Sequence, residues 1–251
     1  MPRFFVPAEQ VHGATVVISG RDAEHVARSL RMRPGETVIV VEDGQREHGV
    51  VLDSVSPEEV GGRITWSRDV TGEPALEVHV IQAIPARGMD ETVEALALAG
   101  ATAIWPVLTT RGVARPYPRR VSARLERWRV IAREAAQLAG RARAPTVHQT
   151  LPLEAAVRAL PSGCLILACV IDASTAARLV RPDVGRPVAV VIGPEGGLDE
   201  RDRALLHTAG AIEVHLGARV MPSRLAGFLA LSLVLSTAHD LDTAVAPPPV
   251  S

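Results

Sequence analysis

The sequence predicts an α/β protein made of a small β-rich domain followed by a larger domain with a parallel sheet. Short β-branched runs separated by turn residues fill residues 1–72. From residue 76 apolar strands alternate with helical patterns, which is typical of a parallel sheet covered by helices on both faces. We expect a linker at 70–74, so the second domain is placed at 73–243. The proline-rich end, 244–251, is expected to be a disordered tail.

The first domain is expected to hold three strands and one helix. The strands are predicted at 16–18, 38–41 and 49–52, which are short runs of β-branched and aliphatic residues. Glu42-Asp43-Gly44-Gln45 is a hairpin turn signal between the last two strands. A helix is predicted at 22–30, before Pro34-Gly35 prevents its continuation. Small β-barrels of this kind often bind RNA, although a fold alone proves no function.

The second domain is expected to alternate between strands and helices. The strands are predicted at 78–83, 103–108, 164–171, 187–192 and 212–216. The helices are predicted at 89–99, 122–139, 153–160, 199–209 and 225–238. The run 187–192 is apolar throughout, as in a strand that is buried on both faces. In the helix 122–139, Leu125, Trp128 and Ile131 recur at helical spacing and mark the buried side.

The lengths of the apolar runs and the spacing of possible ligand residues argue against a membrane, secreted or metal-dependent protein. No run reaches the roughly 18–20 apolar residues that a membrane helix needs. The N-terminus also lacks the apolar core of a signal peptide, so we expect a cytoplasmic protein. Cys164 and Cys169 lie five positions apart on one predicted strand and would face opposite sides, so no disulfide is expected. No metal site is predicted either, because ligand spacings such as Cys-x-x-Cys and His-Glu-x-x-His are missing and no histidine has an assignable carboxylate partner.

The positive charge is concentrated in the middle of the chain. Formal net charge is −1, and every basic side chain is an arginine rather than a lysine. Ten arginines lie between Arg111 and Arg143, against Glu126 and Glu134. Such an excess suits a polyanion such as RNA, but a solvated helix face explains it equally well.

The strongest functional signal is the turn Gly193-Pro194-Glu195-Gly196-Gly197, which follows a predicted strand. Asp199 then supplies an N-cap oxygen for the next helix. Glycine lets a ligand approach the backbone closely, and a helix N-terminus offers free N–H groups. At the carboxyl end of a strand in an α/β sheet, such a turn is a place where small ligands bind. A tight strand-to-helix connection with no ligand is the alternative reading. The dinucleotide, P-loop and Gly-x-Ser-x-Gly motifs are missing.

Taken with a second motif, this turn resembles a known family. The second motif is Leu216-Gly217-x-Arg219-Val220-Met221, which precedes an apolar C-terminal helix. Together they resemble the ribosomal RNA small-subunit methyltransferase E family of the SPOUT class, which makes 3-methyluridine in small-subunit ribosomal RNA. The resemblance extends over nearly the whole chain, including Arg3-Phe4-Phe5-Val6 near the start and Glu134-Ala135-Ala136-Gln137 in the central helix.

The resemblance implies an N-terminal PUA-like β-barrel, a C-terminal SPOUT domain with a trefoil knot, and a homodimer. It also implies S-adenosyl-L-methionine as cofactor, and 16S ribosomal RNA or the small ribosomal subunit as partner. The implied cofactor-binding residues are Leu167, Ile192, Gly193, Pro194, Glu195, Gly196, Gly197, Leu216, Gly217, Val220, Met221, Ser223 and Ala226. Arg219 is the catalytic candidate, because a cation stabilises the uridine anion that forms when N3 loses its proton. The expected RNA-binding residues are Arg31, Arg111, Arg119, Arg120, Arg124 and Arg141.

Departures from the family pattern leave other functions open, and one of them is the loss of a helical glutamate in Ala95-Leu96-Ala97-Leu98-Ala99-Gly100. Pro222 stands where the family has a positive side chain, and Arg224 where it has an acidic one. The family's lysine after the first strand of the domain has only Arg87 as a counterpart. The first alternative is therefore a non-catalytic RNA-binding or ribosome-assembly factor that retains the SPOUT fold. A second is an enzyme that modifies a different base. No general base is identified.

Overall fold

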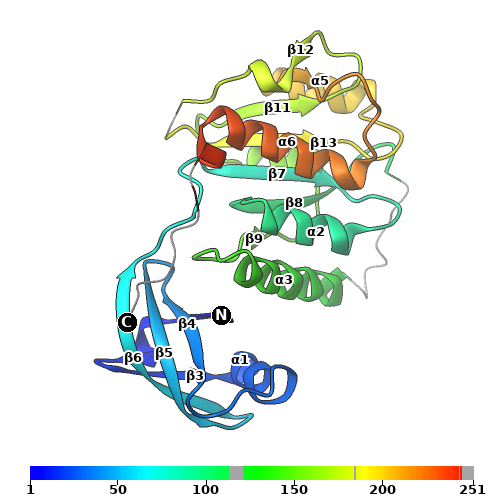
Figure 1. The fold of residues 1–251 in the computed structure, drawn as a ribbon. Coiled ribbons are helices and arrows are strands. Elements are labelled where there is room, and N and C mark those ends of the chain that lie inside the picture. Colours follow the sequence, from blue (N-terminus) through cyan, green and yellow to red (C-terminus); the bar gives the residue numbers. More distant parts are fainter. Residues whose placement is uncertain (113–120, 184, 243, 245–251) are drawn as a thin grey trace. The chain divides into compact units, whose positions relative to one another are not determined.

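The computed structural model describes residues 1–112, 121–183, 185–242 and 244, and these divide into two compact units (Figure 1). Unit 1 holds Met1–Glu73 together with Ala136–Arg143. Unit 2 holds Pro74–Ala135 and Ala144–Ala244. The middle of the chain therefore contributes a segment to the N-terminal unit, which the linear domain boundary predicted from the sequence did not include.

Unit 1 is built on a six-stranded sheet in the order β1-β4-β5-β6-β3-β2. The strands are β1 (Arg3–Val6), β2 (Val11–His12), β3 (Thr15–Ser19), β4 (Thr37–Glu42), β5 (Arg46–Val55) and β6 (Glu59–Asp69). Neighbours are antiparallel except β1 and β4, which are parallel. The helix α1 (Gly20–Glu24) continues into a π-helical turn (His25–Ser29), and a 3-10 turn spans Ala8–Gln10. Phe4, Ile18 and Leu52 are fully buried in the core of this unit. No pairing among the described strands joins β1 to β2, so the closed barrel stays a prediction.

Strand β6 is the longest strand of unit 1, and the sequence pattern did not reveal it. Its residues alternate between more and less buried positions, as a strand with one covered face should. Gly61 and Gly62 weaken the sequence signal for a strand, because glycine is depleted in strands. The structure gives the reason for one of them: a Cβ on Gly62 would lie 2.7 Å from the carbonyl oxygen of Val51 on the neighbouring strand.

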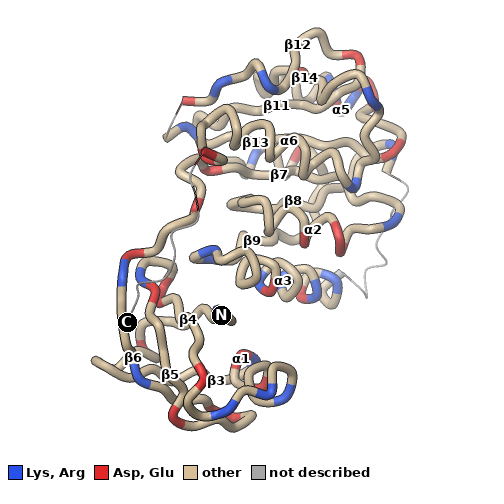
Figure 2. The backbone as a smooth tube through the Cα atoms, viewed as in Figure 1, with Lys and Arg blue, Asp and Glu red and all other residues tan. Residues whose placement is uncertain are grey.

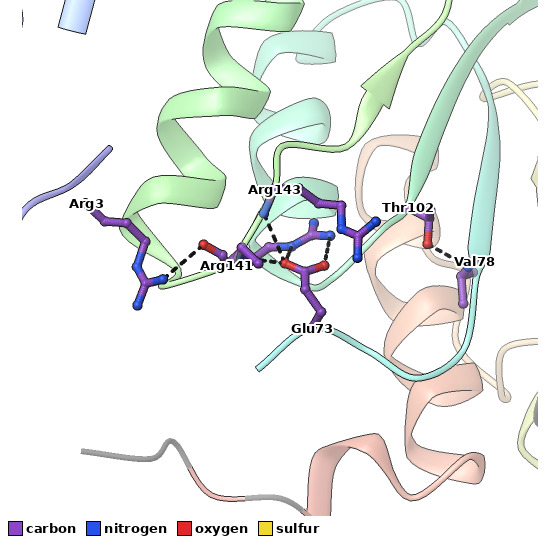
Figure 3. A network of polar contacts seen from close by, with 7 residues as sticks. Arg3, Glu73, Val78, Thr102, Arg141 and Arg143 are labelled. Carbon is purple, nitrogen blue, oxygen red and sulfur yellow. Dashed lines mark hydrogen bonds and ion pairs between the residues drawn. The ribbon is translucent and has the colours of Figure 1, made fainter. Parts of the chain in front are cut away.

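The segment 136–143 is fastened to the rest of unit 1 by the half-buried carboxylate of Glu73 (Figure 3). Glu73 Oε2 accepts a hydrogen bond from Arg141 Nη2 at 2.9 Å, and its Oε1 accepts one from the backbone N–H of Ala142 at 2.8 Å. Arg3 Nη1 donates to the carbonyl oxygen of Arg141 at 3.4 Å. Arg141 is only 3% exposed. The expectation that Arg141 holds an RNA phosphate is thereby corrected, because its guanidinium is committed inside the unit.

Unit 2 contains a parallel sheet in the order β10-β8-β7-β13-β11-β14-β12, with β9 also paired to β8. The strands are β7 (Val78–Ala83), β8 (Ala103–Leu108), β9 (Thr146–Val147), β10 (Leu151–Pro152), β11 (Leu165–Cys169), β12 (Thr175–Ala176), β13 (Val188–Ile192) and β14 (Ile212–His215). The helices are α2 (Met89–Leu98), α3 (Val121–Leu138), α4 (Leu153–Arg158), α5 (Glu200–Thr208) and α6 (Ser223–Thr237), with 3-10 turns at Ala177–Leu179 and Asp240–Asp242. The α/β class predicted from the alternating pattern is confirmed.

Both faces of this sheet are covered, as the continuous apolar strands predicted. Val188, Val190 and Ile192 of β13 pack into the core beneath α2, α3 and α6. Ala189 and Val191 point the other way, into the core beneath α4 and α5. Strand β13 enters the sheet between β7 and β11, both of which precede it in the chain. The carboxyl ends of β11, β13 and β14 therefore meet at one edge of the sheet.

The described residues contain no helix that is both long and apolar enough to cross a membrane. Both cysteines are free thiols. Three histidines that were expected to lack carboxylate partners do have them. His48 Nε2 lies 3.0 Å from Glu42 Oε2, His79 Nε2 lies 2.8 Å from Glu77 Oε1, and His239 Nδ1 lies 2.9 Å from Asp242 Oδ2.

Candidate functional site

A pocket of about 170 Å³ lies at the carboxyl ends of β11, β13 and β14, where α6 begins. Three segments line it: the residues after β11, the glycine loop after β13, and the loop from β14 into α6. The lining residues are Cys169, Val170, Ile171, Ile192, Gly193, Pro194, Glu195, Gly197, Leu216, Val220, Met221, Pro222, Ser223 and Ala226. The pocket therefore sits where the topology of a parallel sheet places ligand sites.

The glycine loop folds back on itself, and its shape depends on a missing side chain. A Cβ on Gly193 would lie 2.9 Å from the backbone nitrogen of Leu198 and 3.1 Å from the carbonyl carbon of Gly197. Gly197 has φ +71°, a conformation that favours glycine, and its N–H donates to Pro194 O at 2.9 Å. A Cβ at Gly197 would meet no atom within 4 Å, so the loop presents open backbone there.

The second loop passes from β14 into α6. Gly217 has φ +114° and donates its N–H to His215 Nδ1 at 3.1 Å. Pro222 then precedes the helix, and its carbonyl oxygen accepts from the N–H of Leu225 at 2.8 Å and of Ala226 at 3.0 Å. The helix thus begins at Ser223, two residues before the predicted start at 225, because this carbonyl provides its first acceptor.

The two loops are joined beneath the pocket by buried hydrogen bonds. Ser223 Oγ donates to the carbonyl oxygen of Gly193 at 2.7 Å. Gln82 Nε2, from the end of β7, lies 3.2 Å from Ser223 Oγ. Both side chains are buried. Sequence reasoning had no signal for Gln82, because the contact links positions 141 residues apart.

A third contact connects the glycine loop to the loop after β7. Glu195 Oε1 accepts a hydrogen bond from the backbone N–H of Ala86 at 3.0 Å. Arg87, which follows, is exposed. The carboxylate of Glu195 thus has a structural partner already, and this favours a loop-shaping role over that of a free base.

The loop after β8 is fastened to the same region. Arg111 Nη1 donates to the carbonyl oxygen of Gly196 at 3.0 Å, and Thr110 Oγ1 donates to Asp202 Oδ1 at 3.3 Å. Asp202 lies buried in the first turn of α5, and this burial, followed by the charge of Asp199, raises its pKa. Arg111 is therefore held against the outside of the glycine loop.

Most residues predicted to bind a cofactor surround this pocket. Leu167, Gly196 and Gly217 do not line it. Leu167 is fully buried in the sheet, so its side chain belongs to the core. The pocket adds residues that were not predicted, namely Cys169, Val170, Ile171 and Pro222. Cys169 is the last residue of β11 and Val170 and Ile171 follow it, so the rule that ligands bind at carboxyl ends of strands would have found all three. Burial raises the pKa of the Cys169 thiol to about 12, so this group is neutral.

The predicted RNA-binding and catalytic arginines occupy different places. Arg219 is exposed on the second loop and does not line the pocket. Arg31 is exposed with φ +52°, and Arg124 is exposed on α3, where acidic and basic residues alternate (Figure 2). Arg119 and Arg120 lie outside the described residues. Among the described residues, no group of His, Cys, Asp and Glu could hold a metal ion.

Comparisons with known proteins agree on one family. A family model described as an RNA methyltransferase domain matches residues 72–235. Ribosomal RNA small subunit methyltransferase E of Mycobacterium tuberculosis is 30% identical over 238 residues, covering 92% of this chain and 90% of that protein. A crystal structure of ribosomal RNA small subunit methyltransferase E from Neisseria gonorrhoeae bound to S-adenosyl methionine is 26% identical, with a TM-score of 0.83, covering 96% of this chain and 98% of that one. A putative methyltransferase from Legionella pneumophila in complex with the same cofactor is 28% identical, with a TM-score of 0.83, covering 94% and 97%.

Proposed function

The chain belongs to the ribosomal RNA small subunit methyltransferase E family, and from this we propose that it transfers a methyl group from S-adenosylmethionine to N3 of a uridine in 16S ribosomal RNA. The observation that carries the proposal is the pocket itself. Two glycine-containing loops and the residues after β11 enclose it at the carboxyl edge of a parallel sheet.

The residues present fit a nucleoside cofactor. Open backbone at Gly197 offers polar groups to a ribose or an adenine edge, and no side chain obstructs them. Leu216, Val220, Met221 and Ala226 supply apolar surface on the opposite loop and helix. When bound, S-adenosylmethionine supplies an electrophilic methyl group. The protein must then align this group with the uridine and exclude water from the site.

Arg219 is the proposed catalytic residue. The N3–H of uridine is weakly acidic, and its loss leaves an anion that a nearby cation stabilises. Arg219 lies immediately before Val220 and Met221, which line the pocket, and the described residues offer it no ion-pair partner. Its charge is therefore free for the substrate. Arg31, Arg111 and Arg124 are the proposed phosphate contacts, because all three are exposed.

Three structural features belong to the same proposal. Unit 1 would act as a PUA-like RNA-binding barrel, and the segment that leads into α6 would be threaded as a trefoil knot. The enzyme would work as a homodimer through α6, where Leu225 and Phe228 are 39% and 42% exposed despite being large and apolar. Light scattering in solution should then give about twice the chain mass.

The experiment is methyl incorporation into small subunits that lack the modification. Purified protein is incubated with S-adenosylmethionine labelled in its methyl group, and the product nucleoside is identified by mass spectrometry. Labelled 3-methyluridine supports the proposal, and a different methylated base would keep the enzyme but change its target. Binding to the subunit without methyl transfer would favour the non-catalytic RNA-binding factor, which the unusual residues Pro222 and Arg224 suggest.

A further inference from the structure

Gln82 is a fully buried polar side chain at a position where an apolar one would be cheaper. It is 0% exposed, at the carboxyl end of β7 and beside Ile192 of β13. Burying an amide is unfavourable unless it is hydrogen-bonded. Its Nε2 has donor contacts to Ala83 O at 2.9 Å, to Ser223 Oγ at 3.2 Å and to Ser223 O at 3.4 Å. The amide thus lies against the first residue of α6.

The rest of the fold makes room for this amide at some cost. A Cβ on Gly227 would lie 2.7 Å from Gln82 Oε1, so any larger residue at this position of α6 would displace the amide from where it lies. Glycine in a helix interior is less favourable than alanine. Gln82 Oε1 itself is buried and has no hydrogen-bond partner among the described residues. Packing alone would favour an apolar residue here, so a different requirement must retain the amide.

Ser223 turns the amide contact into a directed chain. Its hydroxyl proton goes to Gly193 O at 2.7 Å, which leaves the hydroxyl oxygen to accept from Gln82 Nε2. Consecutive hydrogen bonds of this kind strengthen each other. The order Gln82 to Ser223 to Gly193 runs from the sheet, through the first turn of α6, to the start of the glycine loop.

We propose that Gln82 is a positioning residue for the cofactor pocket and acts through the Ser223 hydroxyl on the carbonyl group of Gly193. The inference rests on the proposed function, because it assumes that the pocket binds S-adenosylmethionine. The chain of bonds pins the glycine loop from the side of the sheet and leaves the opposite, open backbone face for the ligand. The glycine loop and the second loop thereby keep a fixed separation before any ligand arrives.

The test compares variants that cut the chain with one that cuts a neighbouring bond. Gln82→Met and Ser223→Ala each break it, and Ser223→Thr keeps the hydroxyl. Thr92→Val is the matched control: the buried Thr92 Oγ1 bonds Gly88 O at 2.8 Å and Arg224 O at 3.2 Å, so it ties α2 to the same turn of α6 without touching Gly193. Calorimetry with S-adenosylhomocysteine measures Kd, and hydrogen–deuterium exchange of residues 193–198 measures loop opening without ligand.

We expect Gln82→Met and Ser223→Ala each to raise Kd about five- to tenfold, as the loss of one hydrogen bond should. The double variant should have a Kd no higher than that of the worse single variant, because both substitutions break the same run of hydrogen bonds. Ser223→Thr keeps the hydroxyl and should bind more tightly than Ser223→Ala, and Thr92→Val should lower the melting temperature with little change in Kd. Hydrogen–deuterium exchange in 193–198 should accelerate only in the variants that carry Gln82→Met or Ser223→Ala.

An unchanged Kd in Gln82→Met and Ser223→Ala would overturn the positioning role. An equal rise in Thr92→Val would overturn it too, since general loosening of α6 would then explain the effect. If the wild type fails to bind S-adenosylhomocysteine, the cofactor proposal fails and this inference with it. If the wild type binds but the two substitutions raise Kd additively in the double variant, the proposed function stands. Only the hydrogen-bond chain from Gln82 through Ser223 to Gly193 is then refuted.

Discussion

The buried Arg141 and the half-buried Glu73 form an ion pair although they lie 68 positions apart in the chain. The pair joins residues 136–143 to the segment that follows β6, within unit 1. Removing one partner leaves the other charged and buried, which typically costs about 3–5 kcal/mol. We therefore expect Glu73→Gln to lower the free energy of unfolding by about 3 kcal/mol or more, measured by urea unfolding followed by circular dichroism. Asp53→Asn breaks the exposed pair with Arg63 and should cost about 0–1 kcal/mol. Similar losses in both variants would contradict this assignment.

The glycine loop should be far more sensitive at Gly193 than at Gly196. A Cβ at Gly193 would collide with backbone atoms of Leu198 and Gly197, whereas at Gly196 it would meet the side chain of Arg111 at an ordinary 3.6 Å. Gly193→Ala should distort the loop and weaken S-adenosylhomocysteine binding at least tenfold in calorimetry. Gly196→Ala should bind nearly like the wild type. A larger loss of binding in Gly196→Ala than in Gly193→Ala would contradict this. It would show that contact with the ligand, rather than the loop's own backbone, decides which glycine can be replaced.

His148 should make the protein less stable in mild acid. Its ring stacks on Trp105 with centroids 3.4 Å apart, and its pKa is lowered below 6.5 by burial first, and then by the charges of His79 and Arg129. A lowered pKa means that the neutral ring stabilises the fold above about pH 6.5, and that this stability is lost as the pH falls through the folded-state pKa. His148→Phe should keep the stack but lose less stability between about pH 7.5 and pH 5, as read from urea unfolding. His12→Gln, at an exposed histidine of β2, is measured alongside as the matched histidine variant.

Arg124 should contribute one phosphate contact to RNA binding. It is exposed on α3, and none of the described acidic residues pairs with it. Arg124→Ala should weaken binding to small-subunit RNA and reduce the slope of log K against log salt by about one unit. Arg158 on α4 pairs with Glu154, and Arg158→Ala serves as the control with an unchanged slope. If both variants leave the slope intact, the charge on α3 is only a solvated helix face.

The double substitution Pro222→Arg with Arg224→Glu tests whether the unusual motif limits the reaction. The Pro222 side chain is exposed at the pocket, and the Arg224 side chain is exposed while its carbonyl oxygen holds Thr92. Neither change removes a bond of the Gln82 chain, so the Kd for S-adenosylhomocysteine should stay within about twofold. The methyl transfer rate should stay the same or rise. Activity that appears only in the double variant would favour the non-catalytic factor for the natural chain.

Local pattern predicted the interior of unit 2 well, because the central strands β7, β8, β11 and β13 are buried along nearly their whole length and are mostly apolar. Strands 78–83 and 103–108 were predicted with the bounds that the structure shows. The motifs of the glycine loop and of 216–221 placed two walls of the pocket. The long-range polar contacts had no such signal. Arg141 looked like its neighbours in a basic segment until Glu73 was found beside it, and nothing near Gln82 in the sequence indicates Ser223. Periodicity reports which face of an element is buried, but not which distant side chain meets it.

Residues 136–143 belong to unit 1 although most of that unit precedes them by more than 60 positions, and this has a consequence for synthesis on the ribosome. Domains generally fold in order as the chain emerges, the N-terminal one first. Here the strands of unit 1 are complete by Asp69, yet Glu73 meets its arginine only once residue 143 has left the exit tunnel. The N-terminal unit therefore lacks this ion pair while β7, α2, β8 and α3 are made. Pausing translation just before Arg141 should lengthen the time during which the nascent chain is open to proteases and chaperones.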